Sequence, residues 1–260
     1  MAEIVLNKNV TESIELTESS RIVCEKGVQA SLIVLLEQKM DVDLSMEIKE
    51  NAALTVFFRN ASEDLTVREK TKVAENGSVR IAYCELEGKK LWRTSFCALE
   101  GRNARASYIS GSLVEDDKHM EIVCDHLCGD SESHMETYAV MVNDSSYYVC
   151  ANGRIENGSH RSVTHQTSRV LTFADRQRAN IIPKLEIEDN DVEASHATSI
   201  GQLDENQLYY LMSRGIQKEE ALRLIALGYL MPLSNVTEDE ELRQYLKELI
   251  EKKVSEACLM

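Results

Sequence analysis

The sequence predicts an all-β domain over residues 1–200 followed by a small α-helical domain over residues 201–260. Apolar and polar residues alternate from about residue 3 to residue 195, which is the period of a strand with one buried face. Turn signals that contain glycine or asparagine separate these stretches. After residue 200 the apolar residues recur with helical spacing. Because 43% of the 260 residues are hydrophobic and only 5% are aromatic, we expect a sizeable aliphatic core.

The alternation predicts a series of short strands. It is clearest at residues 44–48, 54–58 and 79–83, and it continues at 120–124, 138–142, 147–150 and 185–187. Short strands at irregular spacing suit a sandwich, a barrel or a solenoid. The sequence has no strict six- or nine-residue repeat that would choose among them. The periodicity therefore leaves these three architectures open.

Three helices are expected after residue 200. Asp204 and Gln207 form a capping box for the first helix, and Gly215 offers a left-handed stop. The second helix is predicted over residues 218–227 with Gly228 at its end, and Pro232 is expected to interrupt the helical path after it. For the third helix, Thr237 and Glu240 repeat the capping box ahead of an apolar stripe that consists of Leu242, Tyr245, Leu246, Leu249 and Ile250. Such an appendage is suited to covering the end of a sheet or presenting a docking face.

Composition excludes several classes of protein. The formal net charge is −15, from 29 basic and 44 acidic residues, so binding to nucleic acid or to an anionic membrane is disfavoured. The longest aliphatic run, residues 32–36, is far shorter than the ~20 residues that span a bilayer. The first residues lack the features of a signal peptide. The seven cysteines cannot all pair with one another because their number is odd, so a disulfide framework is not expected. We therefore expect a cytoplasmic protein.

One cluster of metal-binding residue types occurs in the predicted β domain. Cys124, His126 and Cys128 offer two thiolates and an imidazole, which are ligands for zinc or for an iron–sulfur centre. In a strand they would lie on one face with steps of about 6–7 Å. No second cysteine pair follows, so ordinary strand residues are the favoured interpretation. The phosphate-loop, dinucleotide and nucleophile-elbow motifs are absent, and a β-helical polysaccharide hydrolase remains a disfavoured alternative.

The segment from residue 183 to residue 230 carries a more specific signal. It contains PKLEI at 183–187, DVEASHATSIGQLD at 191–204, QLYYLMSRGI at 207–216 and EALRLIALGYL at 220–230. Upstream, GRI at 153–155 and HQTSR at 165–169 extend the pattern. This combination resembles the C-terminal signature of the SufB/SufD family, and the resemblance is strong over about residues 120–230.

The resemblance implies a fold and a role that the periodicity alone does not. It implies an all-β right-handed parallel β-helix, that is a solenoid, followed by a small helical domain. It further implies a non-enzymatic scaffold subunit of the SUF iron–sulfur cluster assembly machinery. Such subunits pair through the end of the β-helix and recruit the ABC-type ATPase SufC through the helical domain. The partner in pairing is either a SufB-like protein or a second copy of this chain.

Individual site residues follow from the same resemblance. Ser168 stands where SufB has a cysteine linked to cluster assembly, and Ala197 stands where SufB has a glutamate. His196 occupies the place of a SufD histidine at the SufB–SufD interface. His165, Ser168 and His196 are therefore the expected dimer interface, and His196 is the one candidate contact to a transient iron–sulfur cluster.

The predicted ATPase-docking face lies on the first two helices. Tyr209 and Tyr210 stand in a run of four apolar residues, which is too apolar for a single buried stripe. With Arg214, Glu219 and Arg223 they form the face that the resemblance assigns to SufC. Aromatic and arginine side chains are the types that dominate binding energy at interfaces.

Overall fold

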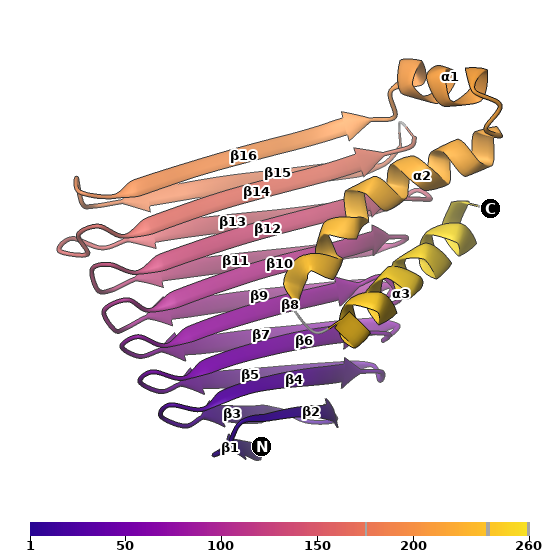
Figure 1. Ribbon diagram of the computed structural model, residues 1–260. Helices are drawn as coiled ribbons and strands as arrows, with labels where there is room; N and C mark the ends of the chain where they lie inside the picture. The colour runs from indigo at the N-terminus through magenta and orange to yellow at the C-terminus, as the bar shows by residue number, and fades with distance from the viewer. Residues whose placement is uncertain (175, 238–239, 259–260) are drawn as a thin grey trace.

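The computed structural model describes residues 1–174, 176–237 and 240–258. It shows a parallel β-solenoid of about seven turns with helices at its C-terminal end, as the resemblance implied. Successive strands alternate between two eight-stranded sheets, and every strand pair is parallel (Figure 1). Each coil of the solenoid thus contributes one strand to each sheet. Among the described residues, no helix combines the length and the apolar character needed to cross a membrane.

The odd sheet contains the odd-numbered strands in chain order. These are β1 (Ala2–Leu6), β3 (Ser20–Cys24), β5 (Met40–Ile48), β7 (Asp64–Val73), β9 (Lys90–Leu99), β11 (Asp117–His126), β13 (Ser146–Ile155) and β15 (Arg178–Ile187). The even sheet is formed by β2 (Val10–Glu15), β4 (Gln29–Leu36), β6 (Ala53–Asn60), β8 (Ser78–Glu85), β10 (Arg105–Val114), β12 (Glu132–Met141), β14 (Val163–Thr172) and β16 (Glu193–Gln202).

Columns of apolar side chains between the two sheets form the main core. In the even sheet, Leu32, Val56, Ile81, Tyr108 and Met135 lie in register on five consecutive strands, and each is at most 1% exposed. The same position on every strand therefore faces inward, while its sequence neighbours face outward. This arrangement is the physical origin of the two-residue period in the sequence.

One turn of most coils has a residue in the left-handed backbone region. Asn51, Asn76, Asn103 and Asp130 occupy this position with φ between 54° and 59°, and Arg161 occupies it with φ 57°. Asparagine and aspartate tolerate this conformation better than most residues do. Arg161 is held there by two hydrogen bonds to Asp130, from Nε at 2.7 Å and from Nη2 at 2.8 Å.

The helical segment packs on the outer face of the even sheet. It consists of α1 (Glu205–Ser213), α2 (Lys218–Leu230), the 3₁₀ helix η1 (Met231–Val236) and α3 (Glu240–Cys258). A second apolar cluster joins α2, η1 and α3 to the outward-facing residues of β6 to β14. Figure 1 shows α2 and α3 lying along the C-terminal halves of these strands. The helices therefore cover a face of the sheet, and they do not close its end.

Two details of the helices differ from the expectation. Gly228 does not end α2, which continues to Leu230 and passes directly into η1. Pro232 lies in the first turn of η1, where its missing N–H costs nothing. The predicted capping box of α3 involves a turn that includes residues 238–239, which lie outside the described residues, so this cap stays a prediction.

A close approach at β10 fixes the position of η1 on the sheet. A Cβ atom added to Gly111 would lie 2.8 Å from Cδ2 of Leu233 in η1. Leu233 itself is fully buried. Glycine at position 111 therefore allows the helical segment to reach the sheet.

A group of buried charges lies inside the solenoid, in the middle of the apolar columns. Arg93 forms ion pairs with Glu69 and with Glu85, the latter at 3.1 Å, and all three side chains are inaccessible to solvent. Tyr83 donates a hydrogen bond to Glu69 at 2.6 Å, and Lys118 donates one to the backbone carbonyl of Glu85 at 2.6 Å. Burial raises the pKa of Glu69 and lowers that of Lys118.

Candidate functional site

The last coil of the solenoid, formed by β15 and β16, presents two open strand edges. Within the described part of the chain, β15 pairs only with β13, and β16 pairs only with β14. Ile200 of β16 lies over the buried Val170 and is 50% exposed, and Ile187 of β15 is 37% exposed over the buried Ile155. This open coil therefore combines unpaired backbone groups with uncovered apolar side chains.

The three residues predicted at the dimer interface do not lie together. His165 pairs in register with Ser195, and His196 pairs with Gln166, whose side chain is buried. Because neighbouring residues of a strand face opposite sides, His165 is on the outer face of the even sheet while His196 is on the inner side of the open coil. Ser168 is 2% exposed and accepts a hydrogen bond from Thr137 at 2.8 Å.

These positions determine which of the three side chains can contact a partner protein. His196 and its neighbour Ala197 are exposed on the open coil. His165 contacts Ser195 through Nδ1 at 2.7 Å, and its ring lies 5.3 Å from that of His134. Ser168 is inside the solenoid one coil below the open end. Only His196 is therefore directly available to a partner that covers the open coil.

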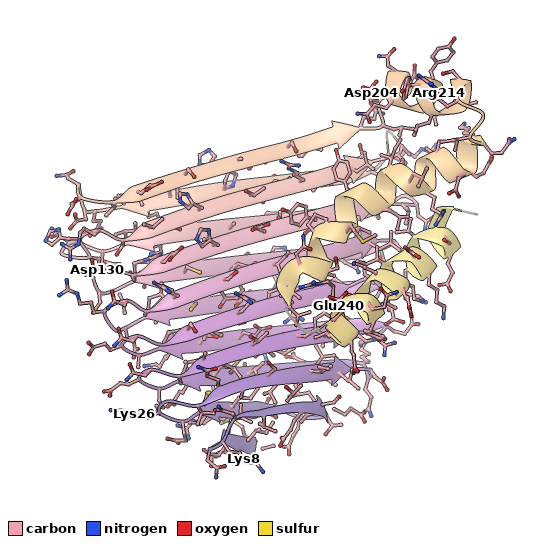
Figure 2. The ribbon with its side chains drawn as sticks, viewed as in Figure 1. Lys8, Lys26, Asp130, Asp204, Arg214 and Glu240 are labelled. Atoms are coloured by element: carbon pink, nitrogen blue, oxygen red, sulfur yellow. The ribbon has the colours of Figure 1, made fainter. Side chains whose placement is uncertain are left out.

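Helix α1 extends beyond the sheet with all of its side chains at least partly accessible. Its N-cap is Asp204, whose side chain accepts a hydrogen bond from the backbone N–H of Asn206, and its C-cap is Arg214 (Figure 2). None of its residues is buried. Tyr209 is 75% exposed, Tyr210 is 56% exposed and Met212 is 46% exposed. An apolar surface of this kind on so short a helix is typical of a binding face.

The other predicted docking residues lie next to this helix. The guanidinium of Arg214 is 5.1 Å from the ring centre of Tyr210, which is a cation–π contact. Glu219 and Arg223 lie in the first turns of α2, and Arg223 binds Glu220 through Nε at 2.7 Å and Nη2 at 2.5 Å. Leu224, a further exposed residue of α2, was not predicted. The docking set thus forms one corner, with Arg223 committed to an ion pair on its own helix.

The cysteine–histidine cluster of β11 does not form a metal centre. Both ring nitrogens of His126 are hydrogen bonded, to Ser131 at 2.7 Å and to Ser133 at 2.8 Å. Cys124 is fully buried, and Cys128 lies past the end of the strand, where its Sγ donates to the carbonyl of Glu100 at 3.0 Å. Among the described residues, no three His, Cys, Asp or Glu side chains are grouped so that they could hold a metal ion. The disfavoured alternative of a metal site at Cys124, His126 and Cys128 therefore has no support in the described residues.

Comparison with protein families decides which family this solenoid represents. A sequence model described as "SUF system FeS cluster assembly, SufBD core domain" matches residues 8–229. This match covers most of the β-solenoid, the open coil and the first two helices. The chain belongs to the SufBD family. Members of the SufBD family work in iron–sulfur cluster assembly.

Individual SufBD relatives show similarity over parts of the chain. The iron–sulfur cluster assembly protein SufD of Bacillus subtilis is 42% identical over 124 residues, which are 48% of this chain and 28% of SufD. SufB of the same organism is 24% identical over 173 residues, which are 65% of this chain and 37% of SufB. A SufBD family protein of Mycobacterium bovis is 27% identical over 204 residues, which are 76% of this chain and 49% of that protein. The chain thus spans about a quarter to a half of the length of these relatives.

Sequence reasoning missed the apolar residues of the open coil of this SufBD protein. Ile187 and Ile200 are exposed although they stand at inward-facing positions of their strands. The alternation in the sequence marks them as core residues. Only the knowledge that no further coil follows in the described chain reveals them as surface residues.

Proposed function

We propose that this chain is a non-catalytic scaffold subunit of a SUF-type iron–sulfur cluster assembly complex. In this proposal it pairs through the open coil and recruits the ABC-type ATPase SufC through α1 and the start of α2. The observation that carries the proposal is the open coil of a SufBD solenoid, with two unpaired strand edges and exposed isoleucines. Unpaired edges of this kind are templates for strand pairing with another chain.

The partner on the open coil is a SufB-like protein or a second copy of this chain. An isologous dimer would bring each exposed Ile200 and His196 close to the same surface of the other copy. Two imidazoles alone are a weak ligand set for a cluster, since clusters require several convergent ligands. Any cluster held at His196 is therefore transient and needs further ligands from the partner.

A charge on the open coil tests the pairing. We expect the wild-type chain, of 29.4 kDa, to have twice that mass by light scattering at micromolar concentration. Ile200→Lys places a charge on the uncovered apolar surface and should give the monomer mass. Val5→Lys is the matched control, because Val5 is 49% exposed, close to the 50% of Ile200, but lies on the first coil. A monomeric wild-type chain that also fails to bind a SufB-like protein would contradict the pairing.

The proposed ATPase-docking face depends on exposed aromatic and cationic groups of α1. Tyr209, Tyr210 and Met212 make little contact with the rest of the chain, so their exposure has no structural explanation within the molecule. Arg214 stacks on Tyr210 and presents the two side chains as one unit. Contacts of such residues with a partner would bury the apolar surface that the chain leaves open.

Two substitutions test the docking face directly. Tyr210→Ala or Arg214→Glu should weaken binding of SufC by about 1–3 kcal/mol, measured by calorimetry, because each removes a large interface side chain. Tyr245→Ala is the matched control, since Tyr245 is 40% exposed on α3, away from α1. Circular dichroism checks that each variant is folded. If both α1 variants bind SufC like the wild type, the docking face lies elsewhere while the pairing proposal is unaffected.

A further inference from the structure

A polar groove of about 770 Å³ lies on the outer face of the even sheet, where the helices leave the sheet uncovered. The helices occupy the C-terminal halves of the strands (Figure 1). The strand residues that line the groove lie in the N-terminal halves of β2 to β12. One wall is formed by Val236 and Thr237 at the end of η1. The volume is within the range of about 300–1,000 Å³ that is typical of small-molecule sites.

The floor of the groove includes a row of polar side chains in strict register. Ser31, Thr55, Arg80, Ser107 and His134 occupy paired positions on five consecutive strands. Neighbouring strands are about 4.8 Å apart, so the row is about 20 Å long. The small hydroxyl side chains keep the floor low beside the helical wall, and they offer donors and acceptors at regular intervals.

The groove also contains two guanidinium groups in a chain whose net charge is −15. Arg80 donates to the backbone carbonyl of Val236 at 3.4 Å, and none of the described carboxylates lies within ion-pair distance of it. Arg105 lies 3.5 Å from Glu132, which also binds Nε2 of His134 at 2.6 Å. Among its described lining residues, the groove therefore has more guanidinium groups than carboxylates, in contrast to the molecule as a whole.

The chemistry of the groove selects among possible ligands. Guanidinium groups and hydroxyls together are typical ligands of phosphate. A peptide is less suited, because the backbone groups of the floor are already paired within the sheet and offer no strand-type hydrogen bonds. No aromatic ring other than the His134 imidazole lines the groove in the described structure, so it offers little for a base to stack on.

We propose that this groove binds a phosphorylated, hydroxyl-rich small molecule of the sugar phosphate class. Arg80 and Arg105 bind the phosphate, and the serine and threonine hydroxyls bind the sugar. The site is distinct from the open coil and from α1, so it stands independently of the proposed function.

Calorimetric titration of the full chain at low ionic strength tests the site. The probes are ribose 5-phosphate, ribose, inorganic phosphate and a hexaglutamate peptide. We expect saturable binding of ribose 5-phosphate and at least tenfold weaker binding of each other probe. Arg80→Gln and Arg105→Gln should each weaken the binding of ribose 5-phosphate at least tenfold. Arg68→Gln, on the outer face of the odd sheet, is the matched control and should bind like the wild type.

A second variant keeps the test independent of Arg80. Ser107→Glu places a carboxylate on the floor of the groove without removing an arginine, and it should abolish binding. Thermal unfolding of every variant establishes that it is folded. The proposal is overturned if ribose 5-phosphate gives no saturable heat, if Ser107→Glu and Arg80→Gln bind it like the wild type, or if hexaglutamate binds more tightly.

Discussion

Arg93 balances the charge of the buried carboxylates in the solenoid interior. Its guanidinium is the cationic partner of both Glu69 and Glu85, and all three side chains are fully buried. Removing one member of such a group leaves a buried charge without compensation, which costs far more than the loss of a surface ion pair. The surface pairs of Arg68 with Asp41 and Asp43 are the natural comparison.

We expect Arg93→Ala to lower the free energy of unfolding by about 3–5 kcal/mol, measured by urea denaturation at pH 7. In this variant the pKa of Glu69, already raised by burial, would rise further. The folded variant would then bind more protons than the unfolded chain. The difference in the free energy of unfolding between wild type and variant should therefore shrink as the pH falls. Arg68→Ala should have only a small effect. An equally small effect of Arg93→Ala would contradict this account.

His126 makes the stability of the protein dependent on pH. Burial lowers its pKa to about 4, while an imidazole in the unfolded chain has a pKa of about 6.5. Between these values the unfolded chain takes up a proton that the native protein does not bind, so the free energy of unfolding falls as the pH falls. The loss contributed by His126 should approach about 3 kcal/mol at pH 4 and then level off.

Urea denaturation at a series of pH values measures this loss. In His126→Gln the contribution of this residue between pH 6.5 and pH 4 should disappear, so the variant should lose less stability than the wild type over that range. His160→Gln is the control, since the side chain of His160 is 61% exposed. If the pH profile of His126→Gln has the same slope as that of the wild type, burial of the neutral imidazole is not the cause.

At single residues, sequence reasoning was limited by the strand register. The expectation that His165, Ser168 and His196 form one interface needs all three on one face. The register between β14 and β16 pairs His196 with Gln166, which puts His165 on the opposite side. The hydrophobic pattern and the turn lengths together set this register. Alternation within β14 alone already places His165 and Ser168 on opposite faces. Cys128 is a similar case. Because β11 ends at His126, Cys128 does not lie on the strand face that the two-residue alternation predicts for it.

Among the elements, contact between η1 and β10 is sensitive to side-chain size. Gly111→Val would push a side chain into Leu233, whose Cδ2 atom lies only 2.8 Å from the point that a Cβ atom of residue 111 would occupy. We expect a loss of about 1–3 kcal/mol in the free energy of unfolding, because overpacking displaces η1. Gly228→Ala is the control, since nothing lies within 4 Å of an added Cβ atom there. It should stabilise α2 by about 0.5–1 kcal/mol, and destabilisation by this control would contradict the packing argument.

Element types were predictable from periodicity alone, and their arrangement required the family resemblance. The alternation at residues 44–48, 54–58 and 79–83 lies within β5, β6 and β8. Periodicity left three architectures open, and the family signature at residues 183–230 selected the solenoid. The end of α2 was placed at Gly228 because glycine often stops helices. The chain stays helical beyond Gly228 because Leu230 and Leu233 pack on the sheet.

At the scale of the whole molecule, the helical segment shares an apolar cluster with the even sheet. Phe57, Ala82, Ile109 and Val140 face outward from the solenoid and are at most 9% exposed because α2, η1 and α3 cover them. The proposed boundary between residues 200 and 201 therefore separates two segments that depend on one another for burial of apolar surface. We expect the first segment to aggregate without the second.

A truncation after Leu203 tests this dependence. The shortened chain should aggregate and should bind a hydrophobic dye strongly, because the outer apolar residues of β6 to β14 become exposed. Light scattering and dye fluorescence measure the two effects. The full chain with Leu224→Ser, a substitution at a residue that is 40% exposed, is the control and should show neither effect. A truncated chain that neither aggregates nor binds the dye would show that the solenoid is self-sufficient.

The parallel register also dictates an order in which the molecule can form during synthesis. Each strand pairs with the strand one coil away, from Gln29 with Ala53 up to Ser146 with Arg178, so every coil can add to the one before it as the chain leaves the ribosome. The contact between Arg80 and Val236 is of another kind, because it joins residues 156 positions apart. The outer apolar residues of β6 to β10 therefore stay exposed until the residues that cover them, up to Val236 and beyond, have been translated. During that interval the nascent solenoid is a natural client for chaperones that bind apolar surfaces.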